Sequence, residues 1–246
     1  MNILFEQFFL ILVILSVAFK TIPVLKVLYK WSLFLMLFSA IGWVGLRGIY
    51  LRHAPFANMY ESLSFFGILY ILKCLLFQKE SPWWLYFPGV VMITLSLLLP
   101  WSYKIPGHIP AALQSIWIFI HVPAYFIGYV SLTLSAFYSV ILQFKVNHER
   151  ENKLRLLVHR ELQISWVFCS TGLVIGGIWA DISWGRFWSW DPKETLALIT
   201  WLIMAAALHF KGKNRVKEIL IIIGFFAMLY TYFGVTFFHS GLHSYT

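Results

Sequence analysis

The sequence has 246 residues, of which 60% are hydrophobic and 12% are charged, about half the charged fraction of an ordinary soluble domain. This composition excludes a water-soluble globular protein and indicates an integral membrane protein. The formal net charge of +9 does not indicate nucleic-acid binding, because the Lys and Arg residues form short clusters between apolar runs, where they set membrane topology. Cys74 and Cys169 lie in separate apolar runs, which excludes a disulfide framework and a Cys-x-x-Cys motif.

Apolar runs of about 20 residues, the length that spans a hydrocarbon core, recur along the whole chain. The first run starts without a basic segment and lacks a small-residue cleavage site, so we expect it to be retained rather than removed as a signal peptide. We therefore expect an all-α polytopic membrane protein in which residues 1–246 form a single membrane domain. The eight predicted transmembrane helices cover residues 3–19, 31–46, 63–77, 84–99, 116–144, 162–182, 195–210 and 219–238.

The basic residues predict the orientation of these helices, because Lys and Arg in short loops stay on the cytoplasmic side. On the eight-helix topology, 14 of the 19 Lys and Arg residues fall on one side of the membrane. The other five are Arg47, Arg52, Lys104, Arg186 and Lys193. The richer side is predicted to be cytoplasmic, which places both termini outside. The basic segment 145–161 is then a cytoplasmic loop, and its interleaved leucines predict a short helix on the membrane surface.

A tryptophan-rich segment, residues 183–194, lies between the sixth and seventh predicted helices on the outer side. Trp184, Trp188 and Trp190 fall within seven residues, with Gly185 among them. Tryptophans are common at membrane interfaces, so an aromatic belt is one interpretation. The alternative is a shelf of indole rings for a flat, amphipathic ligand such as a porphyrin. The residues alone leave both interpretations open.

The end of this segment has the pattern of a helix start. Asp191 as N-cap, Pro192 at the first helical position and Glu194 three residues after the cap predict a capping box. A helix N-terminus also favours an acidic group such as a haem propionate, and Lys193 and Arg186 add positive charge there.

Among the eight histidines, His121 and His243 are predicted near the outer face, on segments far apart in the sequence. Two neutral imidazoles on opposite faces of a porphyrin would complete the coordination of its iron. Taken singly, each is more often a packing residue, and His239 competes with His243 for the same role. His209 ends the seventh helix on the cytoplasmic side. There it either interacts favourably with the helix dipole or serves as a transient binding site for haem that enters from the cytoplasm. His53 stays undecided in an outer loop.

The string from Trp184 to Thr195 resembles the WWD signature of the haem-handling membrane proteins of cytochrome c maturation. The segments 53–63 and 241–245 are similar to the CcsA (ResC) branch, the integral subunit of the system II cytochrome c synthase. The resemblance to that branch extends over most of the chain, from the second predicted helix to the end. One departure is Leu196, where family members usually carry Trp.

The resemblance implies that the WWD loop binds non-covalent haem b as a substrate, with His121 and His243 as axial ligands to the iron and His209 on the transmembrane haem route. The implied shelf residues are Trp184, Gly185, Trp188, Trp190, Asp191, Lys193 and Glu194. The implied activity is that of a lyase-type holocytochrome c synthase subunit, which attaches haem to apocytochrome c Cys-x-x-Cys-His motifs and acts only with a CcsB (ResB) partner. No residue is assigned as a catalytic acid or base.

Two further points follow from the resemblance. The expected location is the bacterial plasma (inner) membrane, with the thylakoid membrane as the alternative. The alternative function is that of a CcmC-like exporter or chaperone, which delivers haem without forming the bond, although the six-helix plan of that relative fits eight predicted helices poorly.

Overall fold

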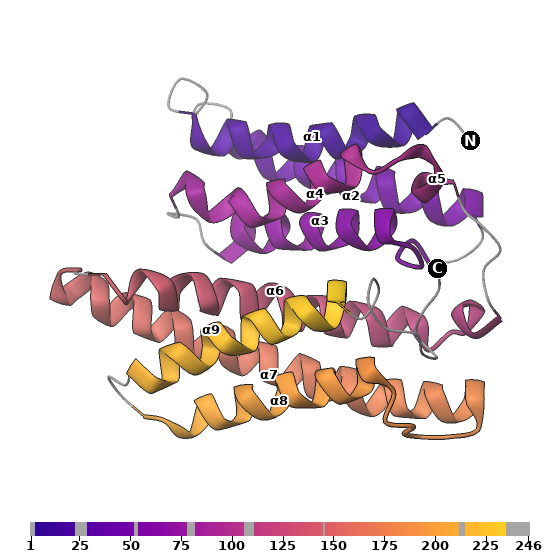
Figure 1. Ribbon diagram of the computed structural model, residues 1–246. Helices are drawn as coiled ribbons and strands as arrows, with labels where there is room; N and C mark the ends of the chain where they lie inside the picture. Colours follow the sequence, from indigo (N-terminus) through magenta and orange to yellow (C-terminus); the bar gives the residue numbers. More distant parts are fainter. Residues whose placement is uncertain are drawn as a thin grey trace. The chain divides into compact units, whose positions relative to one another are not determined.

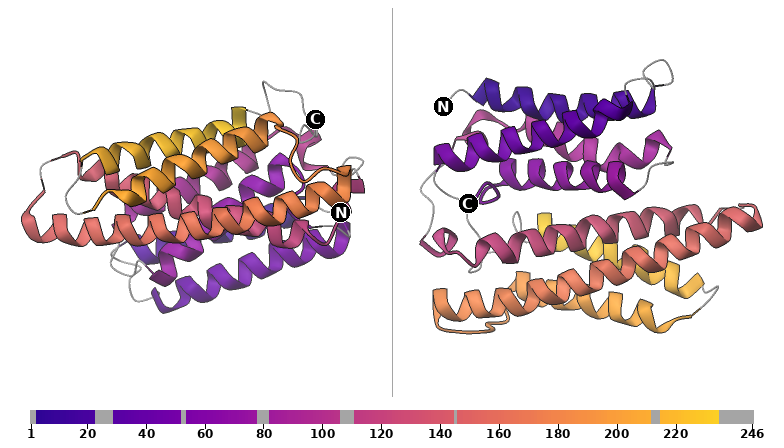
Figure 2. Two further views of the ribbon diagram at one scale, coloured as in Figure 1. Left: turned by 90° about the horizontal axis from the view of Figure 1, so that it is seen from below. Right: turned by 180° about the vertical axis from the view of Figure 1, so that it is seen from behind.

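The computed structural model describes residues 3–22, 29–51, 54–77, 82–105, 111–144, 146–211 and 215–234. Every regular element among these residues is a helix, as the sequence predicts. The chain divides into two compact units, Met1–Gln114 (unit 1) and Ser115–Thr246 (unit 2), and the single membrane domain stays a prediction. Figure 1 and Figure 2 show the helices of each unit packed side by side.

Unit 1 is built from antiparallel helix pairs. The hairpin of α1 (Ile3–Thr21) and α2 (Tyr29–Leu51) is followed by α3 (Met59–Phe77), which packs along α4 (Phe87–Leu98). Short helical turns complete the unit. Two of them begin directly after a proline, at Pro82 and Pro100, because proline interrupts the preceding backbone and favours the start of a new turn. These short elements are η2 (Trp83–Tyr86), α5 (Trp101–Lys104) and η3 (Ala111–Gln114).

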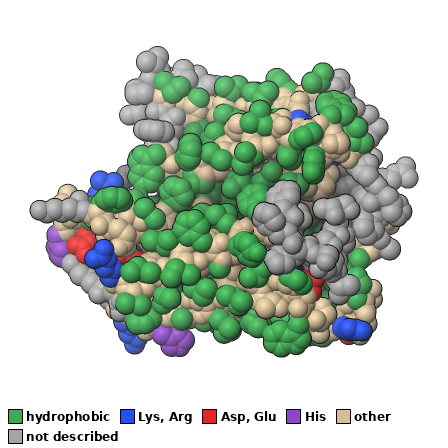
Figure 3. All heavy atoms as spheres, viewed as in Figure 1, with side chains coloured by type: hydrophobic (Ala, Val, Ile, Leu, Met, Phe, Trp, Pro, Cys, Tyr) green, Lys and Arg blue, Asp and Glu red, His purple; other side chains and the backbone are tan. Residues whose placement is uncertain are grey.

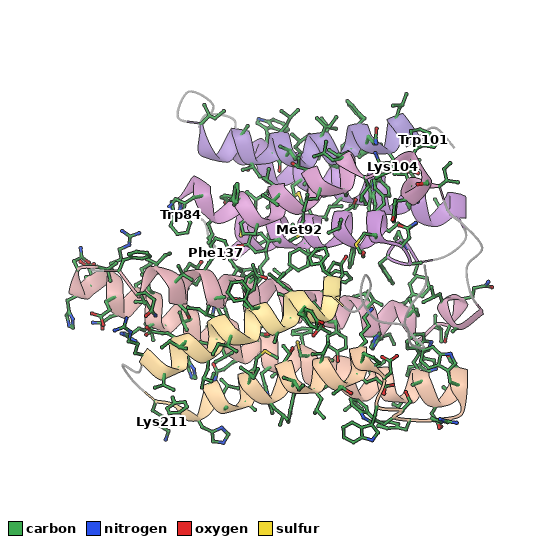
Figure 4. The ribbon with its side chains drawn as sticks, viewed as in Figure 1. Trp84, Met92, Trp101, Lys104, Phe137 and Lys211 are labelled. Carbon is green, nitrogen blue, oxygen red and sulfur yellow. The ribbon has the colours of Figure 1, made fainter. Side chains whose placement is uncertain are left out.

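A buried ion cluster lies at one end of unit 1. The guanidinium of Arg47 on α2 contacts Glu6 of α1 and Glu61 of α3, each at 2.9 Å, and donates to the backbone oxygen of Lys104 at 2.7 Å. All three charged side chains are at most 1% exposed. Figure 4 labels Lys104 at the end of the unit where α1 begins.

This cluster corrects the expectation that Arg47 and Lys104 are loop charges. Arg47 lies inside α2 and is fully buried, and Lys104 is 5% exposed, with its Nζ donating to the Leu97 oxygen at 2.7 Å. A buried charge needs a partner of opposite charge or several hydrogen bonds. Glu6 and Glu61 supply these partners from two other helices, so Arg47 joins three helices instead of marking a loop.

The described part of unit 2 contains four long helices. The helices α6 (Ile118–Ile141) and α7 (His148–Trp184) pack along each other, as do α8 (Pro192–His209) and α9 (Arg215–Leu229), and α9 also contacts α6. A π-helical turn, η4 (Tyr230–Gly234), continues α9. Successive helices run in opposite directions, so the connection between α7 and α8 lies at the end of the unit where α6 begins.

The structure does not contain the separate surface helix that the sequence predicts within residues 145–161. Instead α7 is a continuous helix of 37 residues, about 55 Å long, which starts at the N-cap Asn147. No proline or glycine interrupts it near residue 161. Arg155 pairs with Glu218 of α9, so the charged first turns of α7 are held against the unit rather than lying separately on a surface.

The surface of the helices identifies an integral membrane protein. Five helices among the described residues are long and apolar enough to cross a membrane, by length and composition: α2, α3, α6, α7 and α9 with η4. Large apolar side chains are widely exposed, including Ile49 (82%) and Leu98 (74%), which water would disfavour. Figure 3 shows hydrophobic side chains along the helices, with charged and histidine side chains gathered where α7 begins. Within the described residues a helix lies in each of the eight predicted runs, while the number of crossings and the side of the termini stay predictions.

Candidate functional site

His121 lies in the first turn of α6, at the same end of unit 2 as the WWD loop. Its ring nitrogen Nδ1 lies 3.0 Å from the backbone oxygen of Gly172 on α7. A carbonyl oxygen only accepts, so Nδ1 must carry the proton in this hydrogen bond. The lone pair of the neutral ring is then on Nε2. Metal-binding histidines are usually oriented by this kind of second-nitrogen hydrogen bond.

Two glycines of α7 make room for this end of α6. A Cβ atom at Gly176 would lie 2.5 Å from Cε1 and 2.7 Å from Nδ1 of His121. A Cβ atom at Gly172 would lie 2.7 Å from the ring of Tyr125, one turn after His121. Their spacing of four residues places both glycines on one face of α7. The close approach of imidazole and helix therefore depends on the absence of side chains there.

Aromatic rings connect His121 to the end of α7. The His121 ring centroid lies 5.6 Å from that of Trp179, and Trp179 lies 4.9 Å from Trp184. The ring centroid of Tyr125 lies 5.1 Å from that of the histidine. Trp179 is 2% exposed and was not among the predicted site residues, because a tryptophan inside an apolar helix is ordinarily a packing residue. The structure thus joins His121 and Trp184 through a tryptophan that precedes the predicted loop and was not expected to take part in the site.

The WWD loop leaves α7 through a left-handed glycine. Gly185 has φ +71° and its N–H donates to the Asp181 oxygen at 2.8 Å, which ends the helix. Phe187 then lies against Gly177 of α7, where a Cβ atom would be 2.4 Å from the ring. The loop is therefore folded back on the helix that precedes it.

The planes of neighbouring tryptophan rings at this end of unit 2 are inclined to one another rather than parallel. Trp188 and Trp190 are 5.9 Å apart with their planes at 85°, and Trp179 and Trp184 meet at 60°. The left-handed turn at Gly185 separates the two pairs, because Trp184 still belongs to α7 whereas Trp188 and Trp190 follow the turn. Trp190 is 69% exposed, and the buried Nε1 of Trp188 has no hydrogen-bond partner among the described residues. The rings form two tilted pairs.

The predicted capping box at the start of α8 is confirmed. The Asp191 side chain accepts from the backbone N–H groups of Lys193 (2.8 Å) and Glu194 (3.4 Å), and Glu194 accepts from that of Asp191 (3.3 Å). Lys193 is half-buried, and this burial lowers the pKa of its ammonium, which the nearby Asp191 carboxylate partly opposes. A positive helix end and a cation therefore lie beside the tryptophans.

The other predicted histidines are placed differently. His209 is the exposed last residue of α8, with Nδ1 2.7 Å from the Ala205 oxygen, so it lies at the opposite end of unit 2 from the WWD loop. Lys211, labelled in Figure 4, follows it at that end. His53, His239 and His243 lie outside the described residues. No group of three or more His, Cys, Asp or Glu side chains that could hold a metal ion occurs among the described residues.

Comparisons with known proteins agree with this architecture. The model of the family "Cytochrome C assembly protein" matches residues 3–243. Cytochrome c biogenesis protein CcsA of Chlamydomonas reinhardtii is 34% identical, and the match covers 78% of this chain and 61% of that protein. For CcsA of Prochlorococcus marinus (strain MIT 9515) the identity is 30%, over 98% of this chain and 83% of the relative.

The fold is similar to that of a solved structure, "Cytochrome c Heme Lyase CcmF". The TM-score is 0.60 at 19% identity, and the match covers 93% of this chain and 45% of that one. The fold and its apolar surface define the class as a polytopic helical membrane protein. The chain belongs to the cytochrome c assembly family, among its CcsA-type members.

Proposed function

We propose that this chain is the haem-handling membrane subunit of a cytochrome c synthase, which presents haem b at the extracytoplasmic face for attachment to apocytochrome c. The observation that carries the proposal is the meeting of His121 with the WWD loop at one end of unit 2, through Trp179 and Trp184. The hydrogen bond from Nδ1 to Gly172 supports it, because it orients the ring and places the lone pair of the neutral imidazole on Nε2, the nitrogen that would bind iron in this proposal.

In this proposal His121 and His243 are the axial ligands, one from α6 and one from the tail. The aromatic residues Trp184, Trp188 and Trp190 hold the porphyrin and exclude water, and Gly185 turns the loop around it. The N-terminus of α8 attracts the propionates. Asp191 and Glu194 form that helix end, and Lys193 supplies a positive charge beside it.

The residues of this chain bind and orient the substrate in the proposed reaction. Haem supplies two vinyl groups, and each cysteine thiol of a Cys-x-x-Cys-His motif adds across one of them. The sulfur bonds to one vinyl carbon and the hydrogen to the other, so a thioether forms and no group is released. Holding haem at a fixed position turns this addition into a reaction between oriented groups. We assign no side chain of this chain as the acid or base.

The proposal includes a partner, a route and a membrane. A CcsB (ResB)-like membrane subunit would complete the synthase. His209, at the opposite end of α8 from the WWD loop, is our candidate for a haem way-station on the cytoplasmic side, since its Nδ1 is bonded to the Ala205 oxygen and Nε2 is left for iron. The membrane we propose is the bacterial plasma membrane, with the thylakoid membrane as the alternative.

The absorption spectrum of the detergent-purified protein tests haem binding. We expect a low-spin, six-coordinate spectrum in the wild type and loss of most haem in His121→Ala and His243→Ala. His148→Ala is the matched control, because this exposed histidine lies in the first turn of α7, where its Nε2 lies 3.3 Å from the Asn152 side-chain nitrogen of the same helix. A wild-type protein without haem, or equal haem in all four proteins, would overturn the proposal.

Coexpression separates the synthase from a CcmC-like exporter or chaperone. A synthase subunit produced with a CcsB-like partner and an apocytochrome should yield a holocytochrome that stains for haem after denaturing electrophoresis. An exporter would leave the apocytochrome unstained although this chain itself carries haem. That second result would replace the synthase proposal with the exporter one.

A further inference from the structure

Trp190 has a backbone conformation that is unusual for its side chain. Its φ is +60°, and it is the single non-glycine residue with positive φ in the described part of the chain. A bulky L-residue rarely adopts this left-handed region, because its Cβ approaches the following carbonyl oxygen. Such a conformation persists only where the surroundings hold it, and it often occurs at functional sites.

The surroundings of Trp190 are dominated by one carboxylate. Oε2 of Glu194 accepts from the backbone N–H of Ser189 at 2.8 Å, from the Ser189 hydroxyl at 3.1 Å and from the backbone N–H of Asp191 at 3.3 Å. These two backbone groups flank Trp190 on either side. In addition, the Thr195 hydroxyl donates to the Trp190 oxygen at 3.3 Å. The N–H of the preceding residue, Ser189, and the peptide group that follows Trp190 are thus attached to the first turn of α8.

An ordinary capping box needs less than this. It requires that the third residue of the helix accept from the N-cap N–H, and the Glu194 contact with Asp191 fulfils that requirement. The two shorter contacts, both to Ser189, reach past the cap into the loop. They leave the indole of Trp190 69% exposed beside Trp188. The additional contacts therefore serve the loop rather than the helix end.

We propose that Glu194 is a positioning residue that clamps the backbone around Trp190 and so holds its indole outward for the ligand of the WWD loop. This role differs from the direct haem contact expected from the sequence, because Oε2 is turned back to the loop. The inference rests on the proposed haem-binding function for the nature of the ligand. The clamp itself depends only on the contacts of Ser189, Trp190, Asp191 and Glu194.

Two conservative variants separate the reach of this side chain from its charge. Glu194→Gln keeps the length and one accepting oxygen, whereas Glu194→Asp keeps the charge at the helix N-terminus but is one methylene shorter. If Glu194 acts as a clamp, Gln should retain most haem and Asp should lower haem affinity roughly tenfold, as Glu194→Ala should. The opposite order, with Asp retaining haem and Gln losing it, would show a role through charge and overturn the clamp.

Amide hydrogen exchange gives a readout that does not depend on haem. With a clamp, Glu194→Asp and Glu194→Ala should speed exchange at Ser189 and Asp191 while the later turns of α8 exchange as in the wild type. Unchanged exchange at Ser189 would overturn the clamp even if haem binding fell. If instead no protein of the series bound haem, the proposed function would fail, and exchange would still decide whether Glu194 holds Trp190.

Discussion

At the scale of single residues, the position of His121 depends on the absence of a side chain at Gly176. Gly176 lies under the imidazole of His121, and a Cβ atom there would be 2.5 Å from the ring. Neither a helix-period pattern nor the histidine itself indicates this, because the glycine is on another helix. The position of the imidazole is therefore set jointly by α6 and α7.

Gly176→Ala should push the His121 ring away from α7 and cost about 1–3 kcal/mol through overpacking. We expect a marked fall in the haem-to-protein ratio of the purified variant and a lower thermal midpoint in detergent. Gly45→Ala is the control, since an added Cβ in α2 meets no described atom within 4 Å. Normal haem content in Gly176→Ala would contradict the proposed contact geometry.

Arg47 also illustrates how one residue can organise several helices. It contacts Glu6 and Glu61 with both carboxylates buried, and lies 5.1 Å from the ring of Tyr60. Removing one member of a buried ion cluster leaves the others without compensation. The effect on stability should therefore be much larger than for a surface charge.

We expect Arg47→Ala to destabilise unit 1 by about 3–5 kcal/mol. Thermal unfolding of the detergent-solubilised protein, followed by circular dichroism, measures this. Arg150→Ala, at an exposed position near the start of α7, should change the midpoint little. A similar small shift for both variants would mean that the buried cluster does not join α1, α2 and α3 energetically.

At the scale of elements, α7 is the main difference between expectation and structure. The charged residues 145–161 and the apolar residues after them were expected to be a surface helix and a separate span. A change from charged to apolar residues shows that the environment of a helix changes, for example from water to membrane. The end of a helix is instead signalled by Gly, Pro or a capping residue. Because no such residue is present between them, both parts continue as one helix.

Two proline substitutions distinguish one helix from two. Gln163→Pro lies in the interior of α7 and should cost roughly 3 kcal/mol, because it removes a backbone hydrogen bond and clashes with the preceding turn. His148→Pro lies directly after the N-cap Asn147, where proline is tolerated. We expect only the first to lower the helical signal and the thermal midpoint. Equal tolerance would restore a helix break near residue 162.

At the scale of the whole molecule, the orientation of unit 2 is a prediction: it concerns which end of its helices faces the cytoplasm and which faces outward. The WWD loop lies at one end of unit 2, whereas Lys211 and the start of α7 lie at the other. The excess of Lys and Arg at the second end predicts that it is cytoplasmic. The WWD loop would then face outward.

Cysteine labelling tests this orientation. In a background with Cys74 and Cys169 replaced, Arg186→Cys should react with a membrane-impermeant maleimide in intact cells. Lys211→Cys should react only after the membrane is permeabilised. Both positions are exposed, so access to the reagent reports the side of the membrane. Labelling of Lys211→Cys in intact cells would reverse the predicted topology.

The sequence by itself determined the features that depend on neighbouring residues: the all-helical membrane class, a helix over each of the eight apolar runs, and the capping box at Asp191. Apolar length, helix ends and caps are local properties, so a pattern of residues predicts them. Only the tertiary structure decided that Arg47 is buried, that Trp179 joins His121 to Trp184, and that Glu194 accepts hydrogen bonds from the backbone on both sides of Trp190. These contacts depend on side-chain packing between distant segments and on one backbone angle, for which the sequence carries no local signal.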